Sequence, residues 1–371
     1  MALNIDILNT YYMMGLWKGL SPVNTFFRDR YFPTEPGDIY AADKVLCEYQ
    51  DGDEGMAPFM VERADPIPVA RQGYEIHDYA PTKIAQSRPL TMDDLKKRGY
   101  GEAILSESTE AERANKLVME DLALLERRFV RTEEYLCAQT MLNNGFEVDE
   151  MIDAQTVGNK AKVLYYDATK GNDGIYTISS GDRWTTNTAW SVIVGHVRAM
   201  CRALSRRGRG HTDLLVGQDV ADVLLANSDF NKLVDKNSGI IIASPIVQEL
   251  TKYDGVSLLG IVNFGGYRLN VIVVDEQYAV TTEQNGVKTT TYYNYFPAKG
   301  IMVTSPGCGH LMYAHITHID DNGIYSTIKG KRVPDLFVDR RRKTRELILE
   351  SRPLAAPKNY SPWVYAANAV S

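Results

Sequence analysis

Between residues 109 and 144, apolar positions recur at the spacing of a helix. One face carries residues at intervals of four, four, three, four and seven: Ala114, Val118, Leu122, Leu125, Phe129 and Leu136. The charged residues between them predict an opposite, solvated face: Glu112, Glu120, Glu126, Arg127 and Glu134. A capping box begins at Thr109, and Gly145 is a stop signal. The pattern predicts one helix of roughly 54 Å, which suits a spine or a crossing between subunits better than a layer of a compact enzyme.

Residues 1–38 combine large apolar side chains with frequent glycine and proline. The apolar clusters include Trp17, Phe26 and Phe27, which are followed by Arg28. A segment broken in this way cannot build a core of its own, so these side chains must dock either on the rest of the chain or on a neighbouring subunit. The pattern predicts an arm, and we treat these four residues as candidate contacts between subunits.

The remaining pattern alternates strands, turns and shorter helices. Residues 39–92 indicate a long extended hairpin whose tip carries Pro66 and Pro68, because prolines cannot donate to a strand ladder. Residues 187–207 and 219–236 are spaced as helices, and Gly265-Gly266 and Asn285-Gly286 indicate two tight hairpins. From residue 344 onward the chain is extended. The predicted fold class is α+β.

Composition and charge restrict the classes of function that the chain can have. Hydrophobic residues make up 44% of the 371 residues, so the chain can bury a large core. The net charge is 41 − 47 = −6, which argues weakly against a protein whose main role is wrapping nucleic acid. No run approaches 18 apolar residues, so we expect no membrane-spanning helix, and the first 20 residues lack a secretory pattern. Four widely spaced cysteines predict reduced thiols in a cytosolic protein.

Recognisable catalytic motifs are missing. The sequence contains no phosphate-binding loop, dinucleotide fingerprint, nucleophile elbow or zinc-protease motif. One metal-like cluster exists: Cys308, His310, His315 and His318. In a strand, His315 and His318 point to opposite faces, and His310 lies roughly 26 Å from His318, so one ion cannot bridge them unless a turn intervenes.

Two further groups of charged residues can be explained without a catalytic site. Asp275 and Glu276 end a strand, but neighbouring residues on a strand face apart, so they do not converge on one reacting group. The basic run Arg340, Arg341 and Arg342 is either a solvated turn, a phosphate contact or a salt-bridging surface for a neighbouring subunit. We expect no catalytic, cofactor or metal site, and we keep the basic run as a candidate inter-subunit contact.

The order of elements and four short stretches resemble one protein family. The stretches are Thr25-Phe26-Phe27-Arg28, Tyr79-Ala80-Pro81-Thr82-Lys83-Ile84, Tyr295-Phe296-Pro297 and Glu350-Ser351-Arg352-Pro353-Leu354. Together they resemble the lambda-type (E) major capsid proteins of tailed bacteriophages, which have the Hong Kong 97-type fold.

The resemblance implies a division of the chain into five parts. They are an N-terminal arm (1–38), an extended E-loop hairpin (39–95), a peripheral domain with the spine helix (96–184), an axial domain of mixed α/β structure (185–320) and a return to the peripheral domain (321–371). The hairpin over residues 281–292 is longer than expected, and the resemblance assigns it no role.

The implied function is a head shell. Hexamers and pentamers of the chain would form an icosahedral shell around double-stranded DNA, with no sequence-specific contact to it. A separate scaffolding protein and portal are expected, with a decoration protein at three-fold sites as a further candidate. The resemblance also implies that the chain assembles in the host cytoplasm and becomes part of the virion. The alternatives are an encapsulin-like nanocompartment and a metal-dependent enzyme.

Some proteins of this fold cross-link Lys to Asn from the hairpin loop. Residues 51–90 contain a single lysine, Lys83, near the base of the returning strand. A cross-linking lysine must be held at attack distance in a dry pocket. We therefore predict a non-covalent shell.

Overall fold

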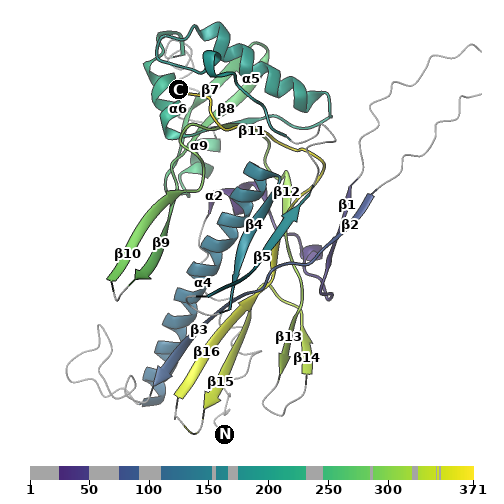
Figure 1. Ribbon diagram of the computed structural model, residues 1–371, viewed down its shortest axis with the longest axis vertical. Coiled ribbons are helices and arrows are strands. Elements are labelled where there is room, and N and C mark those ends of the chain that lie inside the picture. The colour runs from purple at the N-terminus through teal and green to yellow at the C-terminus, as the bar shows by residue number, and fades with distance from the viewer. Residues whose placement is uncertain are drawn as a thin grey trace, which may run out of the picture.

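The computed structural model describes residues 25–49, 75–91, 110–152, 156–165, 174–230, 245–284, 287–319, 325–339, 341 and 344–371. The molecule is elongated, with a helix-covered sheet at one end and a long helix running through the other (Figure 1). The short N-terminal elements are α2 (Phe26–Tyr31), η1 (Pro36–Asp38), β1 (Val45–Tyr49), β2 (Glu75–Tyr79) and β3 (Ile84–Thr91). The part of the chain that the structure describes contains no helix long and apolar enough to cross a membrane.

The helix predicted over residues 109–144 is confirmed. Helix α4 runs from Glu110 to Asn143, and its apolar stripe is buried from Val118 to Leu136. It ends where Asn144 adopts a left-handed conformation (φ 55°), which Asn tolerates better than most residues. The side-chain oxygen of Asn144 accepts a hydrogen bond from the indole of Trp363 at 3.0 Å, so the helix end is fixed to the C-terminal segment.

The predicted charged face of α4 needs a correction. Glu134 was expected in solvent, but it is fully buried, as is its neighbour Glu133. The C-terminal half of the helix is enclosed by α2, by β12 (Gly309–Tyr313) and by the C-terminal segment. Carboxylates there remain in the core because arginines and backbone N–H groups satisfy them.

Two antiparallel hairpins flank the long helix. β4 (Gly145–Met151) pairs with β5 (Val157–Leu164) directly after α4. β15 (Val333–Asp339), β16 (Thr344–Ser351) and β3 form a three-stranded sheet, in which Leu347 and Leu349 pack on Leu125 and Phe129 of α4. The pairing of β3 with β16 joins residues 84–91 to residues 344–351.

A five-stranded sheet forms the other end of the molecule, in the order β18-β11-β6-β8-β7. Its strands are β6 (Asp213–Val216), β7 (Val256–Phe264), β8 (Tyr267–Val274), β11 (Ile301–Thr304) and β18 (Val364–Ala366). Leu214 and Val216 pack under helices α5 (Trp190–Ser205) and α6 (Gln218–Ala226), whereas Leu215 between them packs toward α2 and α4. The sheet is therefore packed on both faces, between two cores, which fits the mainly apolar sequence of its central strands.

The connections include two hairpins of consecutive strands. Gly265 and Gly266 join β7 to β8, as predicted, and β9 (Gln277–Gln284) pairs with β10 (Val287–Asn294), with Asn285 and Gly286 outside the described residues. Helix α6 ends at Ala226, before the predicted residue 236, and α9 (Pro245–Leu250) follows. Two later segments connect different sheets of the molecule. β12 (Gly309–Tyr313) leaves the five-stranded sheet to pair with β17 (Pro353–Pro357), and β18 returns to it.

The described bases of the long N-terminal hairpin are β1 and β2, which pair antiparallel. β13 (Ile316–Ile319) and β14 (Tyr325–Ile328) form a further small hairpin. β12 and β13 are separated at Ala314 and His315, so His310 and His318 do not lie on one continuous strand.

Candidate functional site: the buried junction of α2, α4 and the five-stranded sheet

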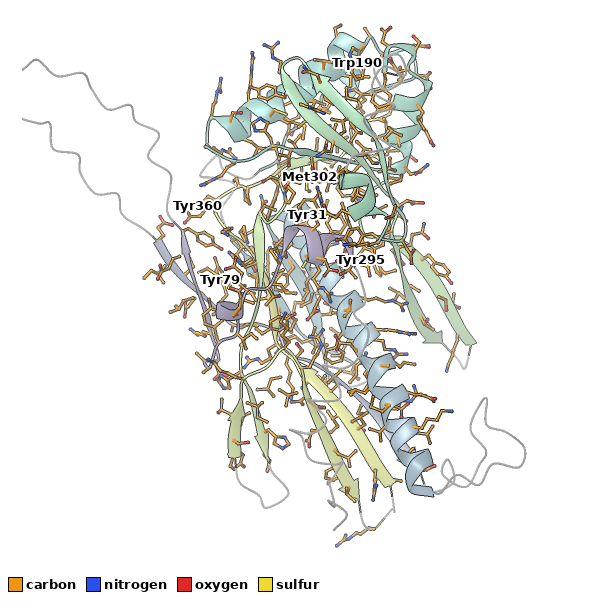
Figure 2. All side chains as sticks on the ribbon, turned by 180° about the vertical axis from the view of Figure 1, so that it is seen from behind. Tyr31, Tyr79, Trp190, Tyr295, Met302 and Tyr360 are labelled. Atoms are coloured by element: carbon orange, nitrogen blue, oxygen red, sulfur yellow. The ribbon has the colours of Figure 1, made fainter. Side chains whose placement is uncertain are left out.

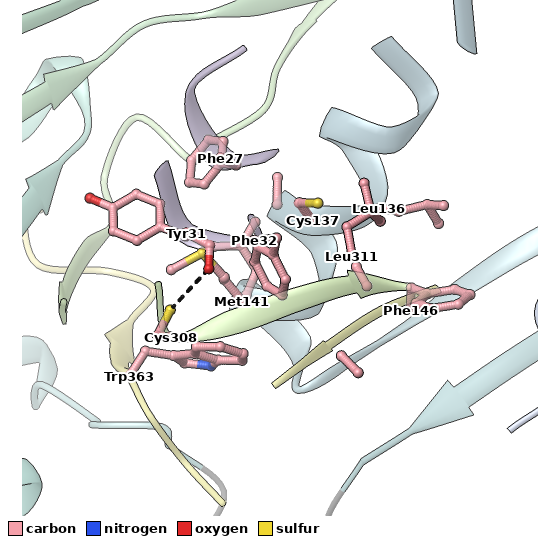
Figure 3. Packing of buried hydrophobic residues seen from close by; sticks show 14 of the residues in the cluster. Phe27, Tyr31, Phe32, Leu136, Cys137, Met141, Phe146, Cys308, Leu311 and Trp363 are labelled. Carbon is pink, nitrogen blue, oxygen red and sulfur yellow. Dashed lines mark hydrogen bonds between the residues drawn. The ribbon is translucent and has the colours of Figure 1, made fainter. Parts of the chain in front are cut away.

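Helix α2 is buried between the two ends of the molecule. The rings of Phe26, Phe27 and Tyr31 are 0–1% exposed and belong to the largest core cluster. Figure 3 shows Phe27, Tyr31 and Phe32 packed over the end of α4. Phe26 and Phe27 were predicted as contacts to a neighbouring subunit, and this must be corrected. They dock on their own chain, which was the other possibility for apolar groups on a segment without its own core.

Glu134 of α4 holds the first turn of α2. Its two carboxylate oxygens accept the backbone N–H groups of Phe27 at 2.6 Å and of Arg28 at 2.8 Å. Thr25 occupies the N-cap position but makes no side-chain cap hydrogen bond. A carboxylate from another helix therefore satisfies N–H groups that the helix itself cannot pair, at the end where the helix dipole favours negative charge.

Arg30 joins α2 to the sheet. Its guanidinium donates two hydrogen bonds to Asp213 Oδ2, from Nε at 2.9 Å and from Nη2 at 2.8 Å. Asp213 begins β6 and also accepts from the Tyr31 hydroxyl at 3.1 Å and from the Asn270 amide at 2.8 Å. The remaining Arg30 nitrogen, Nη1, donates to Glu249 at 2.7 Å. One short helix is thus bonded to α4 by its start and to the sheet by its end.

A second ionic cluster ties α4 to the three-stranded sheet. Arg332, 2% exposed, lies just before β15 and donates to Glu133 from Nη1 (2.6 Å) and Nη2 (2.9 Å). Its Nε donates to Glu126 at 2.8 Å, seven residues before Glu133 on α4. The Tyr313 hydroxyl donates to Glu133 at 2.8 Å, and Ser351 Oγ accepts from Arg332 at 3.1 Å. Every partner is fixed, as a buried ion pair requires.

Charge within this cluster stabilises the ionised forms. Burial acts to raise the pKa of Glu133, but the Arg332 guanidinium and its hydrogen bonds outweigh it and hold that pKa below the usual value. Burial acts to lower the pKa of Arg332, whereas Glu133 raises it well above the usual value. The cluster is therefore permanently charged at neutral pH.

Glu134 behaves differently because another carboxyl faces it. Glu276, in the link between β8 and β9, hydrogen-bonds to Glu134. Burial raises the pKa of Glu276 to about 8, with the neighbouring Glu134 and Asp254 adding to the shift. Burial raises the pKa of Glu134 to about 7, although the N–H groups of α2 oppose this. Two carboxyl groups in contact hold one proton between them near neutral pH, because both cannot ionise cheaply.

The close approach of α2 to β12 depends on one glycine. A Cβ built on Gly309 would lie 2.3 Å from the ring of Phe32 and 2.9 Å from the Ala356 carbonyl oxygen. Any side chain there displaces Phe32, which itself lies 6.1 Å from Trp363 between ring centroids. The preceding Cys308 is buried, and its thiol donates to the Tyr31 carbonyl at 4.0 Å (Figure 3).

Only four of the predicted contact residues, Phe26, Phe27, Arg28 and Arg341, are among the described residues. Trp17, Pro66, Pro68, Arg340 and Arg342 lie outside the described residues. Arg341 is exposed in the turn between β15 and β16.

Arg28 lies within the junction together with Phe26 and Phe27. It bonds to Asp29 at 2.8 Å and to Glu133 at 3.5 Å, with most of its side chain covered.

The histidines of the metal-like cluster are separated from one another. Each lies near a different aspartate: His310 near Asp38 (3.4 Å), His315 near Asp43 (3.4 Å) and His318 near Asp335 (3.6 Å). In the described ranges no three His, Cys, Asp or Glu side chains gather closely enough to hold a metal ion.

Asp275 and Glu276 face apart, as their positions at a strand end predicted. Glu276 turns inward to Glu134. Asp275 is exposed and lies 3.5 Å from the amide of Asn294.

Sequence reasoning missed the residues that build the junction. Glu133 was not considered, and Arg332 is an isolated arginine in a turn region. One signal was available: Glu126 and Glu133 are seven residues apart and thus share a helix face, next to the apolar stripe. Two acidic groups beside a buried stripe indicate a basic partner from elsewhere in the chain.

The fold is shared with a known capsid protein. The crystal structure of the putative capsid protein of a prophage from E. coli CFT073 matches with a TM-score of 0.59 at 14% identity, covering 98% of this chain and 99% of that one. A phage-related protein from Bordetella bronchiseptica RB50 gives a TM-score of 0.46 at 12% identity, covering 96% and 95%. An encapsulin complex from Synechococcus elongatus PCC 7942 gives 0.37 at 8% identity, covering 96% and 95%. Only the first score supports a common fold.

These features define the class as a shell protein with the Hong Kong 97-type fold. The chain belongs to the phage major capsid protein E family, whose model matches residues 9–368. No curated protein matches the sequence. The family is structural and forms part of the virion, and membership favours a phage head over an encapsulin compartment. The resemblance inferred from the four short sequence stretches is therefore confirmed.

Proposed function

We propose that this chain assembles into hexamers and pentamers that close an icosahedral head around the double-stranded DNA of a tailed phage. The observation that carries the proposal is the family match over residues 9–368. Capsid proteins of this family form the shell from many copies of one chain. The buried junction supports such a role, because it uses its charged groups to hold α2, α4 and two sheets together.

Exposed apolar side chains support self-association. Leu46, Ile76, Tyr292, Tyr325 and Phe337 are each more than half exposed, and all of them lie on two- or three-stranded sheets. Apolar groups repeated on projecting strands are typical of surfaces that another protein covers. Arg341 and its neighbours Arg340 and Arg342 would supply charged contacts at the same boundaries.

The regions of the chain would have separate roles in the shell. Residues 39–95 would reach toward a neighbour as the E-loop, and α4 would be the spine of the peripheral domain. The five-stranded sheet with α5 and α6 would form the axial domain at the centre of each capsomer. Residues 1–24 would be the part of the arm that extends beyond the docked helix α2.

Other components would complete the head. We expect a separate scaffolding protein, a portal and, at three-fold sites, a decoration protein, with assembly in the host cytoplasm. The DNA would be enclosed without sequence-specific contacts, in keeping with a net charge of −6.

Electron microscopy of the purified chain tests the proposal. We expect closed particles of mixed size from the chain alone and uniform particles once the scaffolding protein is supplied. Sedimentation only as a 41.6 kDa monomer in both preparations contradicts the shell function. Uniform particles from the chain alone contradict only the need for scaffolding. A portal and terminase encoded nearby, rather than a cargo enzyme, separate a phage head from a nanocompartment.

A further inference from the structure

The β9–β10 hairpin projects from the molecule beside α4 with both faces uncovered (Figures 1 and 2). From Ala279 to Asn294, every side chain that the structure describes is exposed. The exposed fractions reach 40% for Val280, 49% for Tyr293 and 68% for Tyr292. A two-stranded hairpin without a packed face is marginally stable in water. The hairpin is thus built to be covered by something that a single subunit does not provide.

Its base, by contrast, is firmly held. Tyr278 packs edge-on against Tyr135 of α4, with ring centroids 5.4 Å apart, and lies 4.9 Å from Tyr295. The Tyr295 N–H donates to the Glu276 carbonyl at 3.0 Å, and its hydroxyl donates to the Arg131 carbonyl at 3.3 Å. The hairpin therefore leaves the body in a fixed direction, so it can present a defined surface.

The register divides the tyrosines between two faces. Tyr293 pairs with Tyr278, which places both on the face toward α4, and Tyr292 pairs with Ala279 on the opposite face. Thr281 and Thr290, whose hydroxyls lie 3.1 Å apart, continue that outer face. That face accordingly carries Ala279, Thr281, Thr290 and Tyr292, with Tyr292 as its largest aromatic group, and the register places Lys288 on it as well.

The chemistry of the hairpin favours a protein partner over DNA. Residues 277–294 contain one acidic residue, Glu283, and one basic residue, Lys288, so the segment has no net charge. A surface that contacts phosphates needs an excess of basic groups. Exposed tyrosines are instead enriched where proteins meet.

The opposite flank of the molecule carries a second exposed hairpin. β1 and β2 lie on the far side of α4 from β9 and β10 in both views (Figures 1 and 2). Their outward face carries Leu46 and Ile76, which are 55% and 52% exposed. Leu46 pairs with Asp78, and Ile76 pairs with Glu48, so both apolar groups lie on one face. Identical subunits close a ring by joining two different surfaces in a head-to-tail contact.

We propose that, in the assembled shell, the outer face of the β9–β10 hairpin docks on the β1–β2 flank of a second copy of this chain within the same ring. The proposal rests on the proposed shell function. It assigns Tyr292 as the central contact of one flank and Leu46 with Ile76 as its counterpart on the other. It also gives a role to the long hairpin over residues 281–292, which the sequence comparison left without one.

Engineered cysteines test the contact in complete particles. The four native cysteines are buried, and burial raises the pKa of Cys47, next to Leu46, to about 11, so they do not compete for oxidation. The test chain carries Tyr292→Cys and Leu46→Cys together. Controls carry either change alone, or Leu46→Cys with Tyr325→Cys, because Tyr325 is equally exposed on another hairpin.

Particles are oxidised and run on a denaturing gel without reductant. We expect the double variant to give a ladder of multimers that reduction collapses, and the three controls to remain single bands. Particles that form normally while the double variant stays a single band overturn the inference and leave the shell function intact. Self-linking of Tyr292→Cys alone also overturns it, because it shows a symmetric contact. Absence of particles for the unaltered chain contradicts the shell function instead.

Discussion

Replacement of Arg332 by methionine should destabilise the subunit by about 3–5 kcal/mol, the cost of leaving a buried carboxylate without its cation. The side chain of Arg332 is buried and forms paired hydrogen bonds to Glu133 and to Glu126. Methionine fills much of the volume but supplies no charge. Glu133 retains the Tyr313 hydroxyl as a donor and the Arg28 guanidinium at 3.5 Å, so we expect the lower end of the range.

The assay is urea unfolding of unassembled subunits, followed by the fluorescence of the buried tryptophans. A total stability of about 5–15 kcal/mol makes a loss of this size easy to measure. The matched control is Arg88→Met, because Arg88 pairs with Asp121 at 2.8 Å on the outside of the same helix. The Arg88 side chain is 45% exposed, so solvent screens this pair and it contributes about 1 kcal/mol or less. Adding Glu133→Gln to Arg332→Met should recover part of the loss.

The pH dependence gives an independent check. Without Arg332, burial raises the pKa of Glu133 instead of allowing the guanidinium to lower it. The penalty of Arg332→Met should therefore shrink as the pH falls toward 5, since a protonated Glu133 no longer needs a cation. A loss no greater than that of Arg88→Met, or one that does not depend on pH, would refute the role assigned to this cluster.

Three further predictions follow from the fold. Leu125→Pro should cost about 3 kcal/mol or more and prevent assembly, because it interrupts α4 between its two packed halves; normal particles by electron microscopy would contradict a continuous spine. Because the pKa values of Glu134 and Glu276 are raised in the folded state, protonation of this pair stabilises the fold. Its contribution to the free energy of unfolding is fully present below pH 4.5 and is lost as the pH rises toward 8. Glu276→Gln should flatten this pH dependence in urea titrations at several pH values. Boiled mature particles should give one band near 41.6 kDa, because Lys83 is already paired with Glu350; a ladder resistant to boiling would contradict a non-covalent shell.

Local signals predicted the parts of the fold that depend on neighbouring residues. The apolar period of α4 and the Asn285-Gly286 turn each act over a few positions, so the sequence alone located a long helix and a hairpin. The sequence does not decide whether α2 docks on its own chain or on a neighbouring subunit, because Phe26 and Phe27 are equally apolar in both cases. Only the packing against α4 and Phe296 decides it.

The buried ion pairs of the junction could not be predicted from the sequence for a similar reason. Arg332 and Glu133 are 199 positions apart, and Arg30 and Asp213 are 183 apart. A charged residue is solvated in most helices, so a pattern on one segment assigns it to the surface by default. The pairing that permits burial becomes visible only when both segments are placed.

The late position of β18 in the chain bears on how the subunit is made. Strand β11 pairs on one side with β6 and on the other with β18, which the ribosome synthesises after all other strands of the structure. The five-stranded sheet therefore keeps an open edge until residues 364–366 have emerged, and the same holds for β3 until β16 arrives. Contacts between such distant segments form slowly. The five-stranded sheet is consequently complete only after residues 364–366 have left the ribosome, and a nascent chain interrupted before residue 364 leaves one edge of β11 unpaired.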